Sequence, residues 1–134
     1  MTNIGEPYKI LIVDDDKTFL KLISDNLTAK DEHFAVQTAR SGKECLKKVT
    51  SFKPNLVLLD VGMDGMNGLV TLRFIKSIDT STRVYFLSGR SAEYLKEAVG
   101  MVPADGYFTK TKFVANLTSD QSLEAILKSG QSGR

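Results

Sequence analysis

Aspartates with the spacing of a metal or phosphoryl site stand at two places where an apolar run ends. Asp14, Asp15 and Asp16 directly follow the run YKILIV, and Asp60 closes the run NLVLLD. A single aspartate there has an ordinary explanation, because a carboxylate can cap a helix and complement its dipole. Three in a row after a buried strand favour a cluster. Carboxylates that converge repel unless a cation lies among them, and oxygen-only ligands suit Mg²⁺.

Two further polar side chains follow later apolar runs. Ser88 comes after VYFL, and Lys110 comes after GYFT. Alone, each would usually be a solvated residue at the start of a loop, but both fall at the same structural place as the carboxylates. A metal ion and an ammonium can neutralise phosphoryl oxygens, a hydroxyl can donate to one, and a carboxylate can attack phosphorus. The combination predicts a site that holds a phosphoryl group.

The elements that must position these side chains alternate between strands and helices. Short apolar β-rich runs are separated by segments of helical period, which predicts an α/β doubly wound parallel sheet with right-handed crossovers and helices on both faces. Ligands of such sheets bind outside the carboxyl ends of the strands, where the polar residues above lie. The predicted strands are Tyr8–Val13, Phe34–Ala39, Leu56–Leu59, Val84–Leu87 and Gly106–Thr109.

Capping residues and apolar stripes mark the helices. Ser41 with Glu44 three residues later has the pattern of a capping box. The other predicted caps are Asn67, Ser91 and, for a last helix, Ser119 or Asp120. The predicted apolar stripes are Phe19, Leu20, Ile23 and Leu27; Cys45, Leu46 and Val49; Leu69, Leu72 and Ile75; Leu95, Ala98 and Val99; and Leu123, Ile126 and Leu127.

The composition is that of a soluble globular protein. The 134 residues are 42% hydrophobic and 25% charged, which fits one domain, 1–134, with a core at about 8–128 and a disordered tail at 129–134. No apolar run approaches a membrane span, and MTNIGEPYK lacks the apolar segment of a signal peptide. We therefore expect a cytoplasmic protein without membrane contact.

Charge, cysteine and histidine content exclude further classes. Eighteen Lys and Arg stand against sixteen Asp and Glu and are scattered along the chain, which argues against nucleic-acid binding. Cys45 has no partner for an internal disulfide and is expected in the core. His33 is expected at the surface or at a sheet edge.

At these residues the chain resembles the response-regulator receiver domains of two-component signalling, the family of the chemotaxis regulators. The resemblance rests on four ordered motifs, ILIVDDD, LVLLDVGMDGMNG, YFLSG and GYFTK, and extends over about residues 8–128. It implies a flavodoxin-like five-stranded sheet of order 2-1-3-4-5 with five helices. It also implies a phospho-acceptor that takes its phosphoryl group from a sensor histidine kinase or a His-containing phosphotransfer protein and signals to an output partner or domain.

The resemblance also assigns roles residue by residue. Asp16 matches no site residue and is interpreted as a helix cap. The implied roles are Asp60 as the phosphorylated aspartate, Asp15 as a direct Mg²⁺ ligand, Asp14 as a ligand through water, Gly62 as a ligand through its carbonyl, Ser88 and Lys110 as phosphoryl contacts, and Tyr107 as the switch aromatic that responds to Ser88 and remodels the face of helix four, strand five and helix five.

Three positions depart from the family pattern. Asp64 and Thr111 stand where receivers usually have proline, and Gly89 stands where alanine is common. Without a proline after Lys110 we predict a trans peptide bond, because a non-proline cis bond costs about 2.5–4 kcal/mol. The flexible stem of Lys110 should still reach the site. No departure removes a reacting group.

Three other protein classes share some of these features with receivers. A haloacid dehalogenase-type phosphohydrolase needs a second aspartate two residues after the nucleophile, where this chain has Gly62. A flavodoxin-like FMN carrier needs a phosphate-binding loop after the first strand, where DDD would repel the phosphate. A receiver fold used as a phosphorylation-independent interaction module stays open, supported by the altered loops at Asp64 and Thr111.

Overall fold

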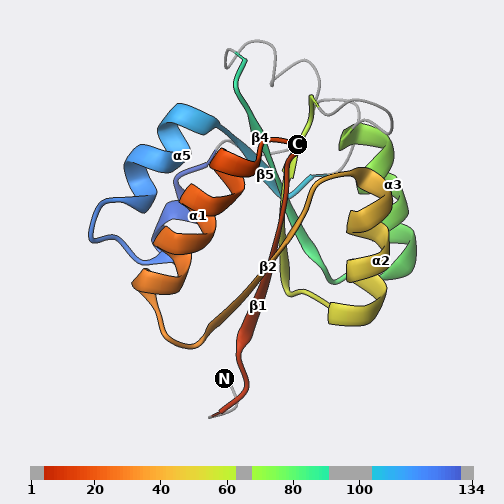
Figure 1. Cartoon of the computed structure of the whole chain (residues 1–134), viewed down its shortest axis with the longest axis horizontal. Coiled ribbons are helices and arrows are strands. Elements are labelled where there is room, and N and C mark those ends of the chain that lie inside the picture. The colour runs from red at the N-terminus through yellow and green to blue at the C-terminus, as the bar shows by residue number, and fades with distance from the viewer. Residues whose placement is uncertain (1–4, 63–67, 91–103, 131–134) are drawn as a thin grey trace.

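Five parallel strands form one sheet in the order β2-β1-β3-β4-β5 (Figure 1). The computed structural model describes residues 5–62, 68–90 and 104–130. The strand order and all five predicted strands are confirmed, with β3 and β4 slightly longer than predicted. The strands are β1 Tyr8–Val13, β2 Phe34–Ala39, β3 Leu56–Asp60, β4 Arg83–Ser88 and β5 Gly106–Thr109.

Helices cover both faces of the sheet. In Figure 1, α1 (Lys17–Lys30) and α5 (Lys110–Leu117) lie on one side, and α2 (Gly42–Phe52) and α3 (Gly68–Ile78) lie on the other. A short helix, α6 (Leu123–Lys128), adds its buried residues to the α1 and α5 side. The sheet residues alternate between two apolar clusters, one on each face, as the period of a strand requires.

The central strand β3 is buried along its whole length. Such a strand is flanked by neighbours and covered by helices, which is why it reads as the continuous run LVLLD rather than as an alternation. It pairs with β1 on one side and β4 on the other, and its last residue, Asp60, lies opposite Leu87. The sheet therefore holds a carboxylate at the carboxyl end of its most buried strand.

The segment after β5 differs from the sequence prediction. One helix was predicted to begin near Ser119 or Asp120, but α5 begins directly after β5 with Thr109 as its N-cap, and α6 begins after Ser122. The apolar pattern of α5 is short, with two buried residues, and its cap belongs to the preceding strand, so periodicity alone did not reveal it. Lys30 Nζ donates to the carbonyl oxygens of residues 119 and 121, at 3.0 and 2.5 Å, and ties the connection between α5 and α6 to α1.

Other local predictions are confirmed where the structure describes them. Ser41 Oγ accepts a hydrogen bond from Glu44 N at 3.1 Å and caps α2. Cys45 is fully buried, and burial raises the pKa of its thiol to about 12. His33 is exposed beside Asp31, with Nδ1 3.2 Å from a carboxylate oxygen.

Some sequence predictions lie outside the described residues: the caps Asn67 and Ser91, the apolar stripe of Leu95, Ala98 and Val99, and the altered loop position Asp64. In the described part of the chain, no helix has the length and apolar character needed to span a membrane.

Asp16 was interpreted as a helix cap, and the structure confirms it. Its Oδ1 accepts hydrogen bonds from Thr18 N at 2.9 Å and Phe19 N at 3.3 Å. We predict that Asp16→Ala lowers the free energy of unfolding by about 1 kcal/mol, because two N–H groups of the first turn lose their acceptor. Asp16→Asn keeps a side-chain acceptor and is the matched control. Urea denaturation at pH 7 measures the difference, and an Ala variant as stable as the Asn variant would contradict the prediction.

Candidate functional site

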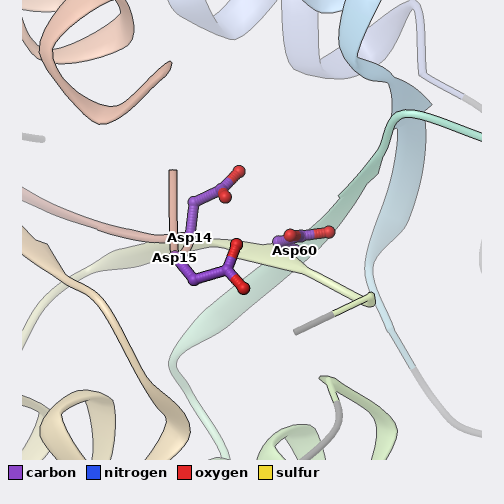
Figure 2. A group of neighbouring side chains, drawn as sticks. All are labelled: Asp14, Asp15 and Asp60. Atoms are coloured by element: carbon purple, nitrogen blue, oxygen red, sulfur yellow. The ribbon is translucent and has the colours of Figure 1, made fainter. Parts of the chain in front are cut away.

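Three carboxylates converge at the carboxyl ends of two neighbouring strands. Asp14 and Asp15 directly follow β1, and Asp60 is the last residue of the adjacent β3. One oxygen from each of the three lies within 4.8 Å of the others, and Figure 2 shows Asp14 and Asp15 on one strand end with Asp60 beside them. The grouping follows from the parallel pairing of β1 with β3, which brings the two strand ends to the same edge.

Backbone N–H groups fix two of these carboxylates in place. Asp14 is 1% exposed and its Oδ1 accepts a hydrogen bond from Asp16 N at 3.0 Å. Asp60 is 7% exposed and its Oδ1 accepts from Gly62 N, also at 3.0 Å. Each bond spans two residues, so the side chain is held by its own turn. Asp15, in contrast, is exposed at the mouth of the group.

Lys110 supplies a positive charge to this group. Its Nζ lies 2.6 Å from Asp14 Oδ2 and 3.6 Å from Asp60 Oδ2. The contact with Asp14 is an ion pair whose angles lie outside those of a normal hydrogen bond, and Oδ2 accepts no other bond. The described part of the chain contains no cis peptide bond, so the Lys110–Thr111 bond is trans. Both predictions about Lys110 are therefore confirmed: its peptide bond is trans, and its ammonium reaches the carboxylates.

Burial and charge act against each other in this ion pair. Burial is the largest influence on Asp14 and, with the nearby charge of Asp60, raises the pKa of its carboxyl above the ordinary value, although Lys110 and the Asp16 N–H oppose this. For Lys110, burial acts to lower the pKa, but the contacts with Asp14 and Asp60 outweigh it and leave the pKa raised. The ammonium is therefore held in its charged form, while the ionised Asp14 is less favourable here than in water.

The donor set fits a small hard cation. The three side chains offer only carboxylate oxygens, and Asp14 Oδ2 is a buried oxygen without a hydrogen-bond donor of normal geometry. Mg²⁺ takes oxygen ligands in octahedral geometry and usually keeps several waters beside one or two carboxylates. The residues present therefore fit the predicted metal.

The predicted hydroxyl lies at the same edge of the sheet. Ser88 ends β4, is 2% exposed, and lies opposite Thr109 in the register of β4 with β5. Its Oγ accepts a hydrogen bond from Arg90 N at 2.9 Å, which leaves the O–H available as a donor. The predicted switch residue Tyr107 is only 7% exposed and packs in the apolar cluster on the α2 and α3 side.

One contact in this site was missed from the sequence. The ring of Phe19 lies 4.5 Å from Lys110 Nζ, centroid to nitrogen, in the geometry of a cation–π interaction. The sequence pattern places Phe19 only in the apolar stripe of its helix. Its place in the first turn of α1, directly after the aspartates, was a usable signal, because side chains there lie near the strand end that precedes the helix.

The fold and the site together define a class of proteins, the doubly wound parallel α/β proteins that gather carboxylates, a lysine and a hydroxyl at the carboxyl ends of their strands. Residues 10–120 match the response regulator receiver domain family, and the chain belongs to that family. This confirms the family predicted from the four motifs.

Individual proteins that are similar to this chain in sequence or structure are consistent with this family. The chemotaxis protein CheY of Bacillus subtilis (strain 168) is 29% identical over 121 residues, which are 90% of this chain and 96% of that protein. The protein-glutamate methylesterase/protein-glutamine glutaminase of the same strain is 32% identical over 132 residues, 94% of this chain and 37% of that protein. In the CheX-CheY-BeF3-Mg²⁺ complex from Borrelia burgdorferi, a chain with a TM-score of 0.71 and 27% identity is matched over 84% of this chain and 88% of that one. The chain thus spans about a third of the methylesterase relatives but nearly all of CheY.

Because the ionised Asp14 is less favourable in the folded protein than in the unfolded chain, its charge costs stability at pH 7. We predict that Asp14→Asn raises the free energy of unfolding in Mg²⁺-free buffer by about 1 kcal/mol, the size of an ordinary single substitution. Asp25→Asn, which alters an exposed carboxylate paired with Lys21, is the control and should change little. Urea denaturation of the three proteins is the measurement. A destabilised Asp14→Asn would show that the pair with Lys110 outweighs burial and repulsion.

Proposed function

We propose that Asp60 accepts a phosphoryl group from the phosphohistidine of a sensor histidine kinase or a His-containing phosphotransfer protein and loses it slowly to water. One observation carries the proposal: Asp60 Oδ2 lies 3.6 Å from the Lys110 ammonium and belongs to the same group of carboxylates as Asp14 and Asp15. The proposed nucleophile, a counter-charge for the incoming oxygens and the carboxylates that would bind a cation thus lie at one edge of the sheet.

The two oxygens of Asp60 have different surroundings. Oδ1 already accepts the Gly62 N–H, whereas Oδ2 faces Lys110. We assign the attack on phosphorus to Oδ2. The bond from Oδ2 to phosphorus forms, the phosphorus–nitrogen bond of the donor breaks, and the imidazole leaves with its electron pair and takes up a proton. In dephosphorylation, water attacks phosphorus, the bond from phosphorus to Oδ2 breaks, inorganic phosphate leaves and the carboxylate is restored.

The remaining residues hold the group that is transferred. Lys110 and the Ser88 hydroxyl bind phosphoryl oxygens, which places positive charge and a donor where negative charge develops. Asp14, Asp15, Asp60 and the carbonyl of Gly62 would hold Mg²⁺, with Asp15 as a direct ligand and Asp14 acting through water. Bound there, Mg²⁺ neutralises charge on the phosphoryl oxygens. The BeF3 and Mg²⁺ of the Borrelia burgdorferi complex support this assignment.

We expect phosphorylation to change the conformation of the residues next to Ser88. We propose that the acyl phosphate draws the Ser88 hydroxyl toward itself and that the Tyr107 side chain on the neighbouring β5 responds. Because the Tyr107 ring is already only 7% exposed, its movement would change what it packs against rather than bury it anew. An output partner or domain then binds the altered surface formed by β5 and the helices beside it.

The assignment predicts that the protein labels itself with a small phosphodonor. Wild-type protein incubated with acetyl phosphate and Mg²⁺ should gain one phosphoryl group that hydroxylamine removes, as expected of an acyl phosphate. Asp60→Asn should abolish labelling at any metal concentration, because the attacking oxygen is gone. Asp15→Asn should show a loss that excess Mg²⁺ partly restores, because a ligand of a hard cation is weakened. Intact-protein mass spectrometry measures the gain.

Two outcomes of that experiment would count against the phospho-acceptor assignment. Folded wild-type protein that neither labels nor binds beryllofluoride would favour the phosphorylation-independent interaction module, with Asp64 and Thr111 as the first residues to replace. Undiminished labelling of Asp60→Asn would place the phosphoryl group on another residue.

The lifetime of the phosphoprotein should depend on residues beside the acceptor. Arg90 follows Ser88 by two residues, its backbone N–H binds Ser88 Oγ, and its side chain is exposed. If the guanidinium shields the acyl phosphate, Arg90→Ala should shorten the lifetime, by roughly twofold to tenfold, while Arg90→Lys keeps the charge and part of the effect. A Cβ at Gly62 would lie 3.7 Å from Asp60 Oδ1, an ordinary van der Waals contact, so Gly62→Ala adds a methyl group beside the acceptor and is a second probe. The decay of labelled protein, separated from acetyl phosphate by rapid desalting and kept in Mg²⁺, gives the rates, and identical rates for Arg90→Ala and wild type would show that Arg90 does not shield the acyl phosphate.

A further inference from the structure

Among the described residues, three side chains contact the Lys110 ammonium, and one of them is uncharged. Asp14 and Asp60 contact Nζ at 2.6 and 3.6 Å, and the Phe19 ring lies 4.5 Å away on the α1 side. Only 22% of the Lys110 side chain is exposed, so these partners replace much of its water. An aromatic face over a partly dehydrated ammonium is attractive, because the ring carries its negative charge density on that face.

The position of the Phe19 ring is fixed from two directions. Its backbone N–H donates to the Asp16 cap at 3.3 Å, which sets the start of α1. Its half-buried side chain packs against the apolar cluster on the α1 and α5 side of the sheet. Lys110 is equally constrained, because it is the first residue of α5 and follows β5 directly. The ring and the ammonium therefore meet as parts of two anchored elements.

The three partners respond differently when the site is loaded. In a loaded site, the carboxylates of Asp14 and Asp60 would be shared with a cation and Asp60 would be bonded to phosphorus, so both would have less charge left for Lys110. The ring of Phe19 offers no oxygen to a metal ion and does not react. It is the partner of Lys110 that loading leaves unchanged.

We propose that Phe19 is a positioning residue, whose ring holds the Lys110 ammonium over the acceptor when the carboxylates are engaged by metal and phosphoryl oxygens. The proposal rests on the phospho-acceptor function of Asp60. Phe19 touches neither the phosphorus nor the metal and acts only through Lys110.

The electronic character of the ring is the property to test. Phenylalanines with one, two and three ring fluorines, built into position 19 of the full chain, keep the shape of the ring but progressively weaken its negative face. The affinity for beryllofluoride in the presence of Mg²⁺ should fall in the order of fluorine number, by about fivefold at the trifluoro ring, which corresponds to the usual size of a cation–π interaction. Phe19→Leu should match the trifluoro protein, and Phe19→Tyr should bind like wild type.

Phe52 provides a matched control on the far side of the sheet. Its ring lies 5.8 Å from Lys9 Nζ, a second ring and ammonium pair, but away from the acidic group. The same fluorinated series at position 52 should leave beryllofluoride affinity unchanged, and urea denaturation of every protein separates folding from binding. In metal-free protein, Phe19→Leu should also shift the NMR signals of the Lys110 ε-methylene downfield, since the ring current is lost.

The outcomes separate this role from the proposed function itself. A graded loss at position 19 with no change at position 52 supports the proposal. A flat series at position 19, in a protein that binds beryllofluoride and labels normally, overturns the role of Phe19 and leaves Asp60 as the acceptor. Wild-type protein that fails to bind and to label overturns the phospho-acceptor assignment, and the positioning role with it.

Discussion

The burial of converging carboxylates is the constraint on which the rest of the site depends. Two of them are buried, so water cannot screen their charges, and N–H groups from their own turns satisfy only one oxygen each. Lys110 is the one basic side chain in the described residues that contacts both Asp14 and Asp60, at 2.6 and 3.6 Å. Asp14 Oδ2 has no hydrogen-bond donor of normal geometry, and burial, more than the charge of Asp60, raises the pKa of this carboxyl. A group that remains short of positive charge is suited to bind a further cation and to accept a group whose transfer that cation assists.

The topology explains why charges that repel are nevertheless brought together. In a parallel sheet every strand ends at the same edge and the helix that follows begins there, so N–H groups of helix first turns gather around the strand ends. Asp16 uses two such N–H groups at α1, and Thr109 uses one at α5. The same arrangement explains why the helices begin with their caps at this edge and why the loops at this edge carry the polar residues. The carboxylates and the helix starts are two consequences of one strand order.

Features encoded by neighbouring residues could be predicted from the sequence, whereas contacts between distant segments could not. Strands and site residues could be predicted because each is encoded locally: LVLLD reads as a buried strand ending on a carboxylate, and the ordered motifs place all the polar residues at strand ends. Helix α5 was missed because its cap, Thr109, is also the last residue of β5, and its apolar pattern has only two buried positions. Phe19 and Lys110 are far apart in the sequence, and their contact depends on α1 and α5 lying on the same face of the sheet. No local pattern reports such a pairing.

The start of α5 at Lys110 also gives this lysine a more constrained backbone than a loop would. Its first turn contains no acidic residue, and a cation there is opposed by the positive end of the helix dipole. The ammonium therefore has an additional reason to extend away from its own helix toward Asp14 and Asp60. Since Thr109 pairs with Ser88 across β4 and β5, the two expected phosphoryl contacts are attached to adjacent strands, one of which continues directly into α5. A displacement of either contact on phosphorylation would then be passed to a helix without an intervening loop, and the connection from α5 to α6 is tied in turn to α1 through Lys30.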